Sequence, residues 1–126
     1  MTIREIAKLL DAQWVCCEDM ADQEILFAFA SDMMSDVLAF VEQETILLTG
    51  LINSQAVRTA EMLDIPCLVF VRGKKPQEEA VRRAKAIGLC ALITKCSMYE
   101  ACGRLYAAGL KAIELDHDGD TDDDDY

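Results

Sequence analysis

Short apolar runs alternate with amphipathic segments along most of the chain. Four apolar runs, at residues 25–30, 45–49, 67–71 and 90–93, show little of the polar alternation of a half-exposed strand. Continuous apolar runs are typical of strands covered on both faces, as in a parallel sheet. Each run is followed by a segment with apolar positions at helical spacing. The pattern predicts a single α/β domain with a parallel, or mostly parallel, sheet and helices on both faces.

The N-terminal part precedes this alternation. Thr2 and Glu5 have the spacing of a capping box, which predicts a helix over residues 3–11. A short strand is expected at residues 13–17 and a polar turn at residues 18–23.

Residues after the apolar runs carry signals for helix ends. Ser31-Asp32 and Asn53 are typical N-caps, and Ser97 begins a second capping box. Pro76 fits the first position of a helix, and Gly88 fits the C-cap of the same helix. A helix is therefore expected after each of the four strands.

Negative charge gathers at the C-terminal end. The formal net charge is −11, and seven of the 23 acidic residues are aspartates within residues 116–125. The other 16 acidic residues face 12 basic ones, so the body is only mildly acidic. We expect a folded domain at residues 1–112 and an acidic, disordered tail at residues 113–126. Alternating aspartates there resemble part of a calcium loop, but the glutamate that closes such a loop is missing, so no metal is expected.

Composition also limits the partners and the compartment. No apolar run approaches the ~20 residues that span a bilayer, and the N-terminus lacks a signal-peptide pattern. We therefore expect a cytoplasmic protein without a membrane partner. The chain has no clustered basic stretch that would indicate a nucleic-acid partner. The cysteines fall mainly in apolar runs, so they are interpreted as core, with a redox role for Cys96 as a minor alternative. They are Cys16, Cys17, Cys67, Cys90, Cys96 and Cys102.

A ligand site is expected where the parallel strands end. Ligands of open parallel sheets lie beyond the carboxyl ends of the strands, where helix N-termini offer free N–H groups. Small polar and cationic residues at these positions would suit a phosphate or a carboxylate. The candidate residues are Ser31, Asp32, Thr49, Gly50, Asn53, Arg72, Gly73, Lys74, Thr94 and Lys95. The alternative that they only cap helices and solvate a turn stays open.

Several kinds of catalytic chemistry lack their residues. His117 is the sole histidine and lies in the acidic segment, so no Ser–His or Cys–His pair is expected in the folded body. Gly73-Lys74-Lys75 lacks the first glycine and the Ser or Thr of a P-loop. The chain is therefore expected to be no enzyme and to need no cofactor.

Five stretches resemble a known family. They lie at residues 28–38, 45–50, 58–63, 69–74 and 97–106. They resemble stand-alone DRTGG-domain proteins of anaerobic bacteria over roughly residues 1–110. Related domains form regulatory segments in some phosphate acetyltransferases and CBS-domain inorganic pyrophosphatases. The fold is similar to the N-terminal domain of HPr kinase/phosphorylase.

The resemblance implies an α/β fold, a tendency to form a homodimer, and a regulatory role without catalysis. It carries over the positions Ser31, Asp32, Thr49, Gly50, Arg72 and Gly73. In this chain Leu51-Ile52 follows Thr49-Gly50, and no contiguous Asp-Arg-Thr-Gly-Gly string occurs.

Three functions are weighed on these observations. The first is a regulatory, ligand-sensing module that binds a small anionic metabolite or nucleotide at the ends of the strands and acts as a dimer. The second is an interaction module that dimerises or docks on a metabolic enzyme, with an adaptable apolar surface supplied by Met33, Met34, Met98 and Tyr99. The third, a phosphotransfer enzyme, has the least support.

Overall fold

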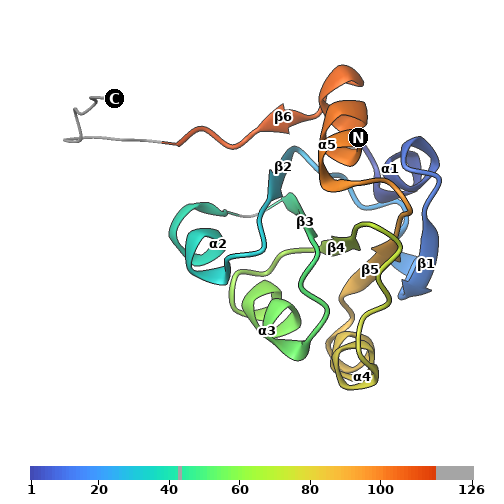
Figure 1. Ribbon diagram of the computed structural model, residues 1–126, viewed down its shortest axis with the longest axis vertical. Coiled ribbons are helices and arrows are strands. Elements are labelled where there is room, and N and C mark those ends of the chain that lie inside the picture. Colours follow the sequence, from blue (N-terminus) through green and yellow to red (C-terminus); the bar gives the residue numbers. More distant parts are fainter. Residues whose placement is uncertain (43, 116–126) are drawn as a thin grey trace.

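The computed structural model describes residues 1–42 and 44–115, and within them six strands form one sheet (Figure 1). Its strand order is β1-β5-β4-β3-β2-β6. The strands are β1 (Gln13–Cys16), β2 (Phe27–Ala30), β3 (Thr45–Thr49), β4 (Cys67–Phe70), β5 (Cys90–Ile93) and β6 (Lys111–Ala112). The helices are α1 (Ile3–Leu9), α2 (Met34–Phe40), α3 (Ser54–Met62), α4 (Glu78–Ile87) and α5 (Met98–Ala107), with a 3₁₀ turn η1 (Glu18–Met20). The predictions for His117 and for the aspartates of 116–125 lie outside the described residues.

The four predicted central strands are parallel, and they lie side by side in chain order. Within β3, Leu47 is in register with Phe29 of β2 and with Leu68 of β4. The antiparallel β1 flanks β5, and the short parallel β6 flanks β2. The prediction of a mostly parallel sheet is confirmed. The sequence pattern predicted β1 as a strand but not its antiparallel direction. It did not predict β6.

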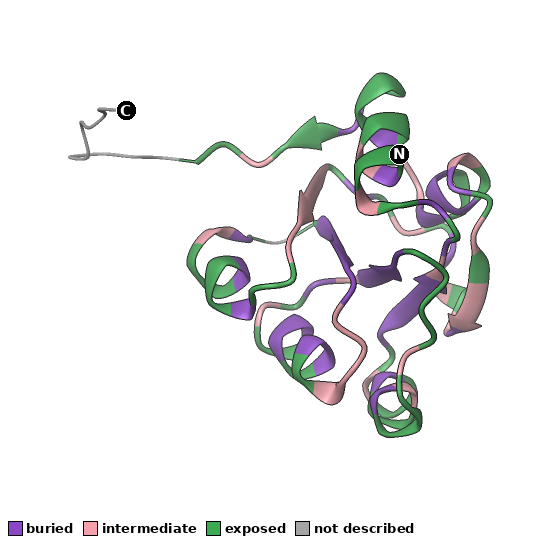
Figure 2. Ribbon diagram, in the orientation of Figure 1, coloured by how far each residue is buried: buried purple, intermediate pink, exposed green. Residues whose placement is uncertain are grey.

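Helices cover both faces of the sheet, as predicted. Ile46 and Leu48 belong to the core beneath α1 and α5, whereas Leu47 belongs to the core beneath α2, α3 and α4. Buried positions line the inner sides of these helices and fill β3, β4 and most of β5, whereas β2 is only half-buried, contrary to the prediction of a buried strand there (Figure 2). The absence of polar alternation in β3 follows from this double burial, since successive side chains point to opposite faces.

The chain changes faces after β5. The connections from β2 to β5 run through α2, α3 and α4, which pack on one face. The next helix, α5, packs on the other face and returns the chain to β6, beside β2. Crevices in open α/β sheets form where the winding direction changes, at the carboxyl ends of the strands. In this fold that place is the segment between β5 and α5.

Most of the predicted helix signals work as expected. The Thr2 side chain accepts a hydrogen bond from the Glu5 N–H, and the Glu5 carboxylate accepts one from the Thr2 N–H at 2.8 Å. Asn53 caps α3 and Ser97 caps α5 through their side chains. Gly88 ends α4 in the left-handed conformation, which glycine adopts at no steric cost. In the described part of the chain, no helix is long and apolar enough to cross a membrane.

Pro76 does not occupy the first helical position. The N-cap of α4 is Gln77, and the helix begins at Glu78. The Gln77 N–H donates to the carbonyl of Ile52 at 2.8 Å. This bond holds Gln77 in an extended conformation and delays the start of the helix.

A substitution at Leu68 tests the packing of the buried central sheet. The Leu68 side chain is fully buried in β4, so Leu68→Ala should lower the free energy of unfolding by roughly 2–5 kcal/mol. Met62→Ala on α3 is the control, because Met62 is 67% exposed and should change stability by less than about 0.5 kcal/mol. Urea midpoints measure both values. Equal midpoints for the two variants would contradict this packing.

Candidate functional site

Asp32 ties the loop after β2 to the end of β3. Its Oδ1 accepts hydrogen bonds from the Gly50 N–H at 2.6 Å and from the Thr49 hydroxyl at 3.1 Å. The Thr49 Oγ1 in turn accepts the Leu51 N–H at 3.1 Å. Asp32 was expected to cap α2, but its side chain binds the end of β3 instead. The N-cap of α2 is Met33, which has no side-chain cap, and its N–H donates to the Ser31 hydroxyl at 3.0 Å.

The turn after β4 is tied to the segment after β5. The Arg72 N–H donates to the Cys96 carbonyl, and the Gly73 N–H donates to the Thr94 carbonyl, both at 2.8 Å. Arg72 and Gly73 have φ values of 62° and 65°. The left-handed conformation costs an L-residue roughly 1–2 kcal/mol, and glycine avoids this cost. An arginine in this conformation indicates that the tight turn holds it there, which is common at ligand sites.

Gly50 leaves room for the Arg72 guanidinium. A methyl group at Gly50 would lie 2.6 Å from Nη2 of Arg72 and 3.5 Å from Oδ1 of Asp32. The guanidinium therefore lies over the end of β3, although it starts from the turn after β4. Among the predicted residues, Asp32, Thr49, Gly50 and Arg72 form one continuous group.

Four exposed cations follow β4 and β5, and we call them the cationic edge. They are Arg72, Lys74, Lys75 and Lys95. Among the residues that the structure describes, none of them has a carboxylate oxygen within 4.0 Å, whereas Arg4, Arg82, Arg83 and Arg104 are in ion pairs. Their charge is therefore available to a ligand.

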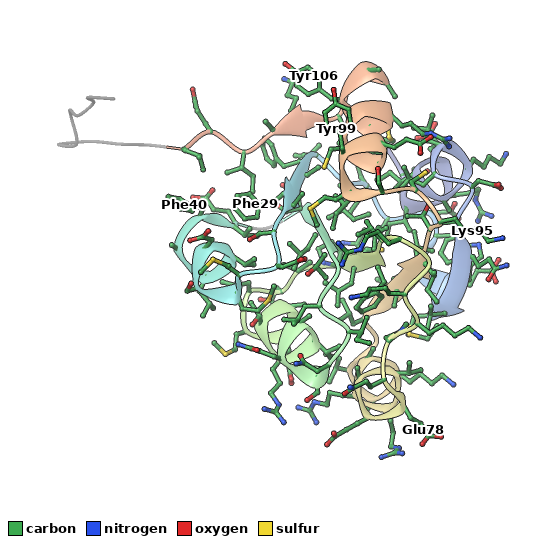
Figure 3. The ribbon with its side chains drawn as sticks, viewed as in Figure 1. Phe29, Phe40, Glu78, Lys95, Tyr99 and Tyr106 are labelled. Carbon is green, nitrogen blue, oxygen red and sulfur yellow. The ribbon has the colours of Figure 1, made fainter. Side chains whose placement is uncertain are left out.

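A surface cavity of about 470 Å³ borders the cationic edge. It lies between the start of β1, the end of β5 and the first turns of α5, where the chain changes faces. Figure 3 shows Lys95 on the segment that leads into α5. The charged and polar residues that line it are Asp11, Gln13, Lys75, Lys95, Glu100 and Arg104.

Arg104 is held within this cavity by its own partners. It donates to the Glu100 carboxylate at 2.6 Å and to the Leu9 carbonyl at 3.0 Å. The hydrogen bond to Glu100 raises the pKa of Arg104. Arg104 thus fixes α5 to the end of α1, while Lys75 and Lys95 remain the free cations of the cavity.

Besides Asp32 and Thr49, three more of the predicted site residues have structural partners. The Thr94 side chain is buried, and its hydroxyl donates to the Leu10 carbonyl at 2.6 Å. Asn53 accepts the Gln55 N–H, and Ser31 accepts the Met33 N–H. These residues shape the edge of the sheet, and their side-chain oxygens form hydrogen bonds with backbone groups.

The sequence did not single out Lys75 as a ligand-binding residue, nor Gln13 and Arg104. Lys75 was visible as part of a basic turn. Gln13 and Arg104 reach the cavity because β1 docks antiparallel on β5 and α5 packs against α1. No local signal in the sequence carries either arrangement.

Two of the cysteines that were interpreted as core, Cys16 and Cys67, have thiols of low reactivity. Burial raises the pKa of Cys16 to about 12, with a smaller contribution from its neighbour Cys17. Burial also raises the pKa of Cys67 well above its usual value, and Cys90 adds to this effect. These groups stay protonated at neutral pH and are weak nucleophiles. Within residues 1–42 and 44–115, no group of three or more His, Cys, Asp or Glu side chains could hold a metal ion.

A second, apolar cavity of about 350 Å³ lies between β2, α5 and β6. We call it the apolar groove, and its larger apolar and aromatic side chains are Phe29, Leu48, Tyr99, Leu105, Tyr106 and Leu110. Tyr99 is 90% exposed and Tyr106 is 73% exposed, and both project from α5 (Figure 3).

The predicted adaptable surface forms only in part. Tyr99 and Met33 are exposed. Met34 is buried against α3, however, and Met98 packs against the core beneath α1 and α5.

Comparison with known proteins gives a likeness of fold. No family model matches the chain, and no curated protein matches it. A similar solved structure is the crystal structure of the CBS and DRTGG domains of the regulatory region of Clostridium perfringens pyrophosphatase, complexed with the activator diadenosine tetraphosphate. The TM-score is 0.65 at 14% sequence identity, over 82% of this chain and 45% of that chain. The chain thus spans less than half of that structure, and the likeness supports a DRTGG-like α/β fold.

Arg72 provides a test of the strained turn. Arg72→Gly should raise the free energy of unfolding by roughly 0.5–1 kcal/mol, because glycine adopts the left-handed conformation without a Cβ clash. Arg72→Ala is the matched control, since alanine keeps that clash and should bring no gain. Urea denaturation measures both variants. A loss of stability in the glycine variant would show that the turn is not strained.

Proposed function

We propose that this protein is a non-catalytic regulatory module that binds a small anionic metabolite or nucleotide at the cationic edge. One observation carries the proposal: four exposed cations, none with a carboxylate partner among the described residues, lie beside a surface cavity at the carboxyl ends of the parallel strands. In an acidic protein, such an uncompensated cluster favours an anionic ligand locally.

The available groups suit phosphate or carboxylate oxygens. Arg72 offers a planar guanidinium that binds either group in a bidentate manner, and the lysines act as point charges. A volume of about 470 Å³ lies within the range of small-molecule sites, roughly 300–1,000 Å³. The first turn of α5 lies at the same cavity, and helix N-termini favour anions.

The surroundings support sensing in preference to catalysis. The Asp32 carboxylate is occupied by two hydrogen bonds to its own chain, and the buried Cys16 and Cys67 stay protonated. Arg104 has a fixed structural partner in Glu100. The solved structure with a similar fold belongs to a regulatory region with a bound activator nucleotide, which is consistent with a role in ligand sensing.

A thermal-shift screen tests this function. The compounds are adenine and guanine nucleotides, acyl phosphates and common phosphometabolites. A ligand at a hundred times its dissociation constant should add about 2.7 kcal/mol of stability, or several degrees in Tm for a domain of this size. Arg72→Ala should abolish or strongly reduce the shift.

Arg58→Ala is the control for this screen. Arg58 is also exposed and without an ion-pair partner among the described residues, but it lies on α3, away from the cavity. The control should keep the full shift. No saturable shift with any compound, or equal losses in the two variants, would count against the proposal.

A second candidate is a homodimer formed through the apolar groove. The specific observation in its favour is the exposure of Tyr99 and Tyr106 beside this groove. Aromatic side chains are enriched in interfaces, and a two-fold dimer would bury the same patch on both copies. Dimerisation at this face is compatible with ligand binding at the cationic edge.

The double variant Tyr99→Ser/Tyr106→Ser tests the dimer. Sedimentation equilibrium should show a dimer for the natural chain and a dissociation constant at least tenfold weaker for the variant. Met62→Ser, an exposed position on α3, should leave the association unchanged. A monomer at every concentration up to the millimolar range would rule out this interface.

A further inference from the structure

The cations of the cationic edge are spread over three neighbouring strand ends. The Arg72 guanidinium lies over Gly50, at the end of β3. Lys74 and Lys75 belong to the turn after β4, and Lys95 follows β5. Because β3, β4 and β5 are adjacent in the sheet, and neighbouring strands lie about 4.8 Å apart, the charges extend over roughly 10 Å.

Gly73 lies between the two ends of this row. It has a φ of 65°, and a methyl group there would have a single neighbour within 4 Å, the Cγ of Lys95 at 3.9 Å. No side chain at this position therefore separates the Arg72 side of the edge from the Lys75 and Lys95 side. Position 73 therefore leaves the row of charges uninterrupted between the ends of β4 and β5.

The nearby carboxylates do not neutralise the row. The cavity and the cationic edge together hold five cations, namely Arg72, Lys74, Lys75, Lys95 and Arg104. The carboxylates beside them are Asp11, Asp32 and Glu100. Glu100 is paired with Arg104, and the charges of Asp11 and Asp32 offset only two of the other four cations. A local excess of positive charge thus remains in a chain whose net charge is −11.

We infer that the ligand of this site carries a chain of linked phosphates, lying along the cationic edge from Arg72 to Lys95. The inference rests on the proposed function and specifies its ligand class. A single phosphate or carboxylate contacts the cations at one strand end and leaves the others without a partner. Linked phosphates contact successive cations along the row, and each charge-assisted contact adds to the affinity.

Titration calorimetry with a phosphate series tests the inference. The full chain is titrated with inorganic phosphate, pyrophosphate and tripolyphosphate at one fixed ionic strength. Tripolyphosphate should bind at least tenfold more tightly than phosphate. Lys95→Gln should remove most of this advantage, because the loss of one end of the row weakens tripolyphosphate binding by a larger factor than phosphate binding.

A charge-matched variant controls for general electrostatics. Lys85→Gln removes one exposed lysine from the last turn of α4, away from the cavity, and should keep the full advantage of tripolyphosphate. An equal loss in Lys85→Gln and Lys95→Gln would overturn the inference, since diffuse charge would then explain the binding. Equal affinities for phosphate and tripolyphosphate would also overturn it, while leaving the proposed function standing. The absence of binding by all three anions, together with a screen without shifts, would overturn the proposed function itself.

Discussion

The burial of the central strands on both faces is the constraint on which the rest of this structure depends. Ile46, Leu47 and Leu48 are fully buried although they point to opposite sides of the sheet. A sheet of this kind has few places for polar groups other than the ends of its strands. The hydrogen bonds of Asp32, Thr49 and Thr94 all lie at the carboxyl ends. They give the loops there a defined shape, and that shape presents the cations.

The same loops explain why charge is concentrated at this edge. The turn after β4 is held by backbone hydrogen bonds from Arg72 and Gly73 to the segment after β5. This turn keeps Arg72 in a left-handed conformation and directs its side chain over Gly50. Glycine at position 50 is required for this close approach and not for its φ angle. Strain, close packing and unpaired charge therefore meet at one place, which is typical of functional sites.

The sequence predicted the parts of the fold whose signals are local and strong. The four central strands lie within one or two residues of the apolar runs, because an uninterrupted apolar run is a strong local signal. The two-residue β6 has no apolar signal, since both of its residues are exposed. The antiparallel direction of β1 depends on tertiary packing and could not be predicted. For the same reason Gln13 and Arg104 were not predicted as cavity residues. Asp32 lies at the end of β2 as predicted, but its side chain binds Thr49 and Gly50 and does not cap α2.

The most direct test of the central claim is a nuclear magnetic resonance titration of the ¹⁵N-labelled chain with tripolyphosphate. The account predicts saturable shifts of backbone amides concentrated at Gly50, Gly73 and Lys95, which border the cationic edge. Amides of the apolar groove, such as those of Phe29 and Tyr106, should stay unchanged. Saturable shifts centred on another surface, or no saturable shifts at all, would contradict the assignment of the anion site to the carboxyl ends of the strands.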